Sequence, residues 1–204
     1  MTIFNRSNSS FSSYFIVYAV SLGAALITGC SPESDGQPDN IKEKNAGVAS
    51  VRRIAEAHIS PTEGHESEGV VTFIEEVGGI RVIADIRNLS INGRHGFHIH
   101  ENGDCSAPDA SSAGGHFNPS GEDHAGPDDS RRHVGDLGNL EATEAGSAMY
   151  VRVDEHLSFD GLNSIIGKAV VVHDSADDFK SQPSGAAGAR IACGVIEWTE
   201  NFSK

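Results

Sequence analysis

The amino-acid sequence predicts an all-β fold, an antiparallel sandwich or barrel, from about residue 50 to the C-terminus. Several short segments there are rich in β-branched residues and alternate apolar with polar side chains, which is typical of strands that bury one face. Gly-rich turns separate these segments, and no 12-residue stretch of this region shows a convincing apolar stripe of helical period. Six or more short strands of this kind favour an antiparallel sandwich or barrel.

The strands follow in chain order. Residues 69–76 and 80–88 both alternate, and the Val77-Gly78-Gly79 break between them predicts a hairpin turn. Residues 165–173 are almost continuously apolar. The other expected strands cover residues 52–60, a run that ends at 98–100, residues 147–155 and residues 190–198.

Two long stretches, residues 101–140 and 174–189, interrupt this series of strands. Structureless loops longer than about 12–15 residues inside a compact domain are usually functional. We therefore expect the chemistry of the protein on these two loops and on the strand ends beside them.

The N-terminal region predicts export. Residues 14–27 are mostly apolar but shorter than the roughly 20 residues of a spanning helix, as in the core of a signal peptide. The following Leu26-Ile27-Thr28-Gly29-Cys30 resembles a bacterial lipoprotein cleavage box, in which Cys30 is acylated. The alternative is an ordinary signal peptide in which Cys30 is incidental. The predicted organisation is a signal peptide (1–29), the lipidated cysteine with a flexible linker (30–49) and the folded domain (50–204).

The composition of the 204-residue chain limits the classes of function that it can have. Fifteen Lys and Arg against 29 Asp and Glu give a formal net charge of −14, which argues against a nucleic-acid partner because such partners require a basic face. Ten His and three Cys indicate metal chemistry. Apart from Cys30, Cys105 and Cys193 are an even pair that an oxidising compartment favours joining as a disulfide. Two buried free thiols are the alternative.

Most histidines lie on the two loops and their edges. His98 and His100 are two residues apart in a strand-like run, so both imidazoles lie on one face and can reach one ion. The first loop adds three imidazoles and a carboxylate in Gly- and Pro-rich sequence, a reasonable tetrahedral zinc set. His173 ends an apolar strand and is either a satisfied core histidine or part of a nitrogen-rich copper site. The loop residues are His116, His124, His133 and Asp136.

Five spaced blocks resemble the copper–zinc superoxide dismutase family and occur in that family's order. The resemblance covers roughly residues 51–200, and Ala186 is a mild departure from the residues usual at its position. The position of Cys105, five residues after His100, resembles bacterial members, here in an exported lipoprotein form. The blocks are residues 96–104, 116–119, 132–139, 171–173 and 185–196.

The resemblance implies an eight-stranded antiparallel Greek-key barrel, an immunoglobulin-like sandwich, with two long functional loops. It also implies that His116 bridges a copper ion and a zinc ion. Asp177 matches the carboxylate that links His98 with His124, and Cys105 with Cys193 matches the intrasubunit disulfide. The implied copper ligands are His98, His100, His116 and His173, and the implied zinc ligands are His116, His124, His133 and Asp136.

The implied enzyme converts two superoxide anions and two protons to dioxygen and hydrogen peroxide by alternating reduction and reoxidation of copper. Catalytic roles fall to His116, which delivers a proton, and to Arg190, the cation beside copper. Zinc, which is redox-silent, would hold the other side of His116. Lys180 is either an ordinary solvated lysine or a second steering charge.

Four other interpretations of the sequence explain its features less well. A non-enzymatic periplasmic copper and zinc buffer on the same fold would need neither Arg190 nor Asp177. A copper chaperone would carry a C-x-x-C motif, which this chain lacks. A copper-only dismutase is disfavoured because all four zinc-type ligands are present, and a purely structural adhesion-type sandwich would leave six clustered imidazoles unexplained.

The expected location is the bacterial cell envelope, as a periplasm-facing lipoprotein. Ser31 stands where some inner-membrane lipoproteins carry Asp, which favours the outer membrane. Monomer and homodimer both stay open. Surface or packing roles are expected for His58, His65, His95 and His156, and a solvated pair for Arg131 and Arg132.

Overall fold

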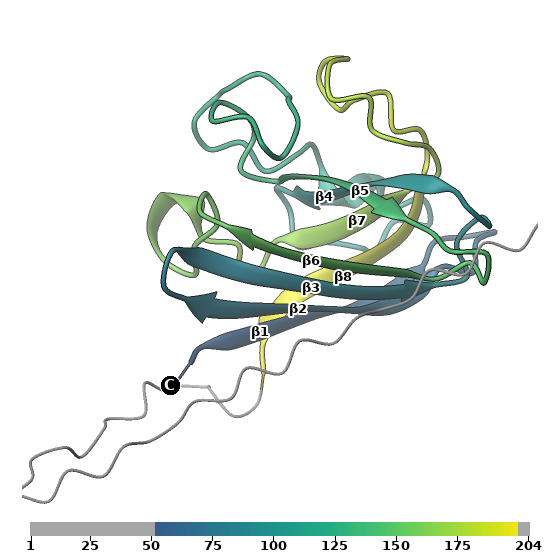
Figure 1. Cartoon of the computed structure of the whole chain (residues 1–204), viewed down its shortest axis with the longest axis horizontal. Coiled ribbons are helices and arrows are strands. Elements are labelled where there is room, and N and C mark those ends of the chain that lie inside the picture. Colours follow the sequence, from purple (N-terminus) through teal and green to yellow (C-terminus); the bar gives the residue numbers. More distant parts are fainter. Residues whose placement is uncertain (1–51, 200–204) are drawn as a thin grey trace, which may run out of the picture. The chain divides into compact units, whose positions relative to one another are not determined.

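The computed structural model describes residues 52–199. The predicted signal peptide, Cys30 and the whole linker lie outside the described residues, so expectations about them stay predictions. The strands are β1 (Ile54–Pro61), β2 (Glu68–Glu76), β3 (Gly79–Arg87), β4 (Arg94–His100), β5 (Asp136–Glu141), β6 (Ala148–Asp154), β7 (Ala169–His173) and β8 (Arg190–Trp198), all shown in Figure 1. Short 3-10 turns cover Ser111–Ala113 and Gly161–Asn163. Within residues 52–199, no helix has the length and apolar character that crossing a membrane requires.

The strands form one antiparallel sheet in the order β5-β4-β7-β8-β1-β2-β3-β6. The non-sequential neighbours β4–β7, β8–β1 and β3–β6 are the crossovers of a Greek-key arrangement. The two end strands approach each other, because Tyr150 Oη on β6 donates to the Leu137 carbonyl on β5 at 2.9 Å. The barrel is therefore nearly closed, and the predicted fold class is confirmed.

The core lies inside this barrel and follows from the alternation of the strands. On β3, Ile80, Val82, Ala84 and Ile86 are buried, while the residues between them face outward. Phe97 on β4 fills the same interior. This packing leaves the outer face of β4 and β7 free to carry polar side chains under the two long loops, which lie over that face in Figure 1.

A smaller apolar cluster fixes the first long loop to the outer face of the barrel. Ala110 and Ala113 of the loop pack against Val171 on β7 and against Cys193 on β8. Cys105 forms a disulfide with Cys193, with the Cα atoms 5.8 Å apart, as predicted. The loop that carries Ala110 is thereby fixed beside Arg190, the first residue of β8.

Two strand predictions need correction. The first long loop was expected to run to residue 140, but β5 begins at Asp136 because its main chain pairs with β4 from His98 back to Arg94. The apolar run 165–173 was expected to be one strand, but β7 begins only at Ala169 because Gly167, at φ +73°, turns the chain. The hairpin between β2 and β3 is confirmed, with Glu76 paired to Gly79.

Candidate metal centre

Three of the predicted copper ligands project from the outer face of the barrel. His98 and His100 lie on β4, whose alternate residues Phe97 and Ile99 enter the core. His173 ends β7, which pairs antiparallel with β4. The strand register therefore brings the three imidazoles together.

His116 joins these residues from the first long loop. A backbone bridge pairs it with His100, and the next amide, Phe117 N, donates to the Ile99 carbonyl at 2.8 Å. One ligand atom from each of the four side chains lies within 4.8 Å of the others, and all four are buried. We call His98, His100, His116 and His173 the strand cluster.

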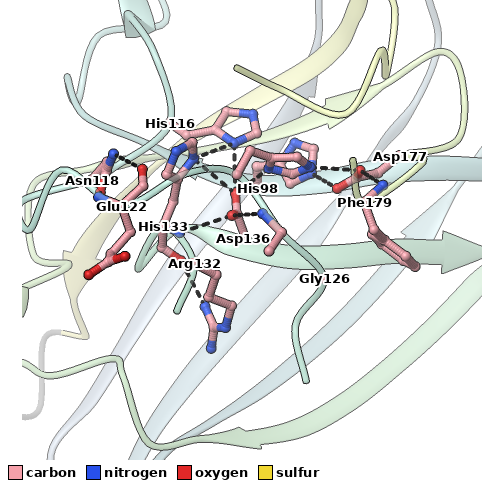
Figure 2. A network of polar contacts seen from close by, with 12 residues as sticks. His98, His116, Asn118, Glu122, Gly126, Arg132, His133, Asp136, Asp177 and Phe179 are labelled. Carbon is pink, nitrogen blue, oxygen red and sulfur yellow. Dashed lines mark hydrogen bonds and ion pairs between the residues drawn. The ribbon is translucent and has the colours of Figure 1, made fainter. Parts of the chain in front are cut away.

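A second group, the loop cluster, consists of His116, His124, His133 and Asp136. Asp136 Oδ1 lies 2.8 Å from His116 Nδ1, 3.0 Å from His124 Nδ1 and 3.3 Å from His133 Nδ1. Tetrahedral zinc with bonds of about 2.0–2.1 Å places its ligand atoms about 3.3 Å apart. The observed spacing is close to that geometry, and Figure 2 shows Asp136 among the histidines.

The buried ring nitrogens provide a test of whether metals fit. Five of them have no hydrogen-bond partner within the described residues, although a buried unsatisfied polar atom costs about 1–3 kcal/mol. His116 offers Nε2, which is one of the five, to the strand cluster and Nδ1 to the loop cluster. A cation in each cluster would satisfy these atoms. The five are His98 Nδ1, His100 Nε2, His116 Nε2, His124 Nδ1 and His173 Nε2.

Asp177 orients one histidine of each cluster. Its Oδ2 lies 2.8 Å from His98 Nε2 and its Oδ1 lies 2.9 Å from His124 Nε2. Both rings therefore turn Nδ1 toward the clusters. Asn139 Oδ1 accepts from the Asp177 amide at 2.7 Å, and Gly185 leaves room, since a Cβ there would lie 1.8 Å from Asp177 Oδ1.

The two clusters differ in charge in the metal-free protein. Burial lowers the pKa of His116 to about 4 and that of His173 to about 3, so the strand cluster offers neutral nitrogens. Burial also opposes the charged form of His124, but the Asp136 carboxylate 3.0 Å away and the hydrogen bond with Asp177 outweigh it and raise its pKa to about 9. Burial disfavours the Asp136 anion, yet the three neighbouring imidazoles, with His116 Nδ1 hydrogen-bonded to it, hold the pKa of Asp136 well below its usual range.

Arg190 lies next to the strand cluster. Its guanidinium donates to the Ala110 carbonyl at 2.6 Å and to the Gly114 carbonyl at 2.7 Å. The Gly114 carbonyl also accepts from His100 Nδ1 at 3.0 Å, which links the cation to a predicted copper ligand. Arg190, His100, His116 and His173 line a common cavity of about 340 Å³, large enough for a small anion. Lys180 is exposed on the second loop.

One prediction near the site was wrong. Arg132 was expected to be solvated, but it is buried and pairs with Asp154 on β6 at 2.6 Å, because the first loop folds back onto that strand. Its Nη1 also donates to the His133 carbonyl at 2.9 Å. No local pattern indicates this role, because Asp154 lies 22 residues further along the chain.

Two further residues near the site, Gln182 and His95, differ in whether the sequence predicted their roles. Gln182, which pairs with the main chain of His124, has no signal in the sequence and was missed. His95 is a packing residue, as predicted, since Nδ1 contacts the His173 carbonyl at 2.8 Å and Nε2 contacts Ser90 Oγ at 2.8 Å.

Comparison with known proteins identifies the family to which the chain is similar. A family model described as copper/zinc superoxide dismutase matches residues 67–196. A Cu-Zn superoxide dismutase of Paramecium bursaria Chlorella virus 1 is 44% identical over 142 residues, covering 66% of this chain and 75% of the viral protein. One from Yarrowia lipolytica is 45% identical over 139 residues, covering 64% of this chain and 90% of the yeast protein.

A solved structure supports the same placement. The crystal structure of the clock protein EA4 aligns with a TM-score of 0.65 and 42% identity, over 72% of this chain and 94% of EA4. The family match, the sequence relatives and the two buried histidine clusters agree. The chain therefore belongs to the copper/zinc superoxide dismutase family and is an oxidoreductase that acts on superoxide, with copper and zinc as cofactors.

Proposed function

We propose that the strand cluster holds copper, that the loop cluster holds zinc, and that His116 is a ligand of both ions. The observation that carries this assignment is the sharing of one imidazole by two buried four-residue clusters, with Nε2 on one side and Nδ1 on the other. Four nitrogens suit copper, whereas three nitrogens and a carboxylate suit zinc.

The proposed reaction consumes two superoxide anions and two protons and yields dioxygen and hydrogen peroxide. Copper, when bound, supplies the one-electron chemistry by taking an electron from one superoxide and giving an electron to the next. Arg190 binds and orients the anion, since its guanidinium lines the cavity beside the strand cluster. His116 Nε2 is buried at this cavity without a hydrogen-bond partner in the described residues, so it can hold a proton there and deliver it to the reduced product.

The loop cluster has a supporting role in this proposal. Asp136 fixes His116 through Nδ1, which leaves Nε2 for the strand cluster. Asp177 keeps His98 and His124 in matching orientations, because its two oxygens contact one ring each. A non-enzymatic metal buffer on the same fold is the alternative, but metal storage has no need of a cation that lines the cavity.

The test is superoxide decay in the presence of protein loaded with one copper and one zinc, measured alongside the metal content. We expect decay near the diffusional limit, and a loss of about 10–100-fold in Arg190→Ala with both metals retained. Arg190→Lys should recover part of the rate because it restores the charge without the fork of donors. Tight binding of both metals without dismutation would favour the buffer.

We also propose that the mature protein is a lipoprotein of the bacterial envelope, anchored through Cys30 to the outer membrane and facing the periplasm. Support comes from the apolar core at residues 14–27 and from the lipobox-like segment before Cys30. Mass spectrometry of the N-terminal peptide should show acylation of Cys30, and fractionation should place the protein with the outer membrane. An unmodified Cys30 in the mature protein would contradict the anchor.

A further inference from the structure

Gln182, in the second long loop, pairs with both main-chain polar groups of one loop-cluster residue. Its Oε1 accepts from the His124 amide at 2.8 Å, and its Nε2 donates to the His124 carbonyl at 2.8 Å. One side chain thus satisfies a donor and an acceptor at once, as a neighbouring strand would.

His124 has fewer local supports than the other members of the loop cluster. His116 is bridged to β4, Asp136 begins β5, and the His133 carbonyl is held by Arg132. His124 instead lies in the middle of the loop, outside any strand. Apart from the Asp136 carboxylate 3.0 Å from its Nδ1, its ring partner Asp177 and its main-chain partner Gln182 both come from the second loop. Its position therefore depends on contacts between the two loops.

The same segment reaches the cavity beside the strand cluster. Pro183 and Ser184, which directly follow Gln182, line that cavity together with His100 and Arg190. Because Gln182 is covalently joined to Pro183, a contact that fixes the Gln182 side chain also restricts this wall.

We propose that Gln182 is a positioning residue that holds the His124 main chain for zinc and, through the same contact, holds Pro183 and Ser184 in place beside the strand cluster. The inference rests on the zinc assignment proposed above. Coupling of this kind is reciprocal, so zinc in the loop cluster should in turn order the cavity wall.

Zinc affinity gives the first test. The first equivalent of zinc is titrated by chelator competition into the purified protein and into Gln182→Ala. Loss of a group that orients a ligand typically lowers metal affinity by about 10–100-fold, and we expect that range for Gln182→Ala. The matched control is Ser181→Ala, which removes a hydrogen bond to Asp178 within the same loop and should change zinc affinity less than about twofold.

Amide hydrogen exchange gives the second test, at single residues. In Gln182→Ala the His124 amide should exchange at least about tenfold faster than in wild type, because it loses its acceptor. Gln182→Glu keeps an acceptor but loses the donor, so it should protect the His124 amide while still binding zinc more weakly. Added zinc should slow exchange at Ser184 and Gly185 in wild type and have little effect there in Gln182→Ala.

The possible results distinguish a failure of the zinc assignment from a failure of the role proposed for Gln182. Wild-type protein that binds no zinc would overturn the zinc assignment itself. Equal zinc affinity and equal His124 exchange in wild type and Gln182→Ala would overturn only the role of Gln182. Equal losses in Gln182→Ala and Ser181→Ala would also overturn it, because general loosening of the loop would then explain both.

Discussion

The strand cluster and the loop cluster share His116 yet are built in different ways. Three members of the strand cluster stand on paired strands, where the register of β4 and β7 fixes their positions. In the loop cluster only Asp136 belongs to a strand. His116 is bridged to β4, His133 is held by the neighbouring Arg132, and His124 depends on Asp177 from the second loop. The strand cluster is therefore part of the barrel framework, whereas the loop cluster depends on how two loops fold together.

Charge separates the two clusters as well. The strand cluster contains imidazoles that burial keeps neutral, so its free nitrogens are ready to bind a metal. The loop cluster contains a buried carboxylate whose charge is compensated by three imidazoles within 3.3 Å of it. Substitutions near the loops should therefore weaken zinc binding more than copper binding, and between pH 6.5 and 5.5 acid should destabilise the metal-free protein mainly through the strand cluster.

The largest expected effect concerns the buried ion pair beneath the loop cluster. Asp154→Ala leaves Arg132 buried without its carboxylate and should lower the free energy of unfolding by about 3–5 kcal/mol. Urea denaturation of the metal-free protein measures this loss. Glu68→Ala is the control, because it removes an exposed pair with Arg87 that is worth about 0–1 kcal/mol. Similar losses in the two variants would show that burial does not distinguish the pairs.

The substitution Asp177→Asn should lower metal affinity by different factors in the two clusters. An amide has one acceptor oxygen in place of two, so either His98 or His124 loses its partner. We expect zinc affinity to fall by about 10–100-fold, and copper affinity to fall less because β4 still positions His98. Separate titrations of the two metals measure this, and a larger loss for copper than for zinc would contradict the framework role of β4.

A smaller effect is expected from pH in the metal-free protein. The pKa of His116 is about 4 and that of His173 about 3, both below the ordinary 6.5, so the unfolded chain binds more protons between these values and 6.5. Their contribution falls as the pH drops below 6.5. His124, with its pKa raised to about 9, has the opposite sign, since its stabilising contribution is present below 6.5 and lost as the pH rises through 9.

Taken together, the shifts of these three groups should lower the free energy of unfolding by about 1–2 kcal/mol between pH 6.5 and 5.5, and the lowered pKa values of the buried His98 and His100 add to this loss. Urea denaturation after chelation checks this value. His173→Leu should reduce the dependence on pH, whereas an unchanged slope in that variant would assign the effect to other groups.

Local sequence pattern predicted the barrel and the strand cluster well. Two predictions rested on local features and are confirmed by the structure. They are the alternation of β2 and β3 and the placement of His98 and His100 on one face of β4. The composition of the first loop suggested its zinc set, whereas the role of Asp177 and the bridging role of His116 depended on family resemblance, because loop contacts join residues far apart in the chain. β5 was missed because Gly138 and Asn139 are poor strand formers, and pairing with β4 decides its structure.

The buried role of Arg132 and the contact of Gln182 could not be predicted for a related reason. Arg132 is buried only because the first loop folds back to meet Asp154 on β6. Gln182 contacts His124, 58 residues earlier in the chain, and no periodicity or spacing records such a contact. Charge and polarity alone place both side chains in solvent, and tertiary structure reverses that expectation for Arg132.

The most direct test of the shared-histidine centre is anomalous diffraction at the copper and zinc absorption edges from crystals of the metal-loaded protein. We expect copper among His98, His100 and His173, zinc among His124, His133 and Asp136, and the His116 ring between the two ions with one nitrogen toward each. A single metal position, or a His116 ring bound to neither ion, would contradict the shared-histidine centre.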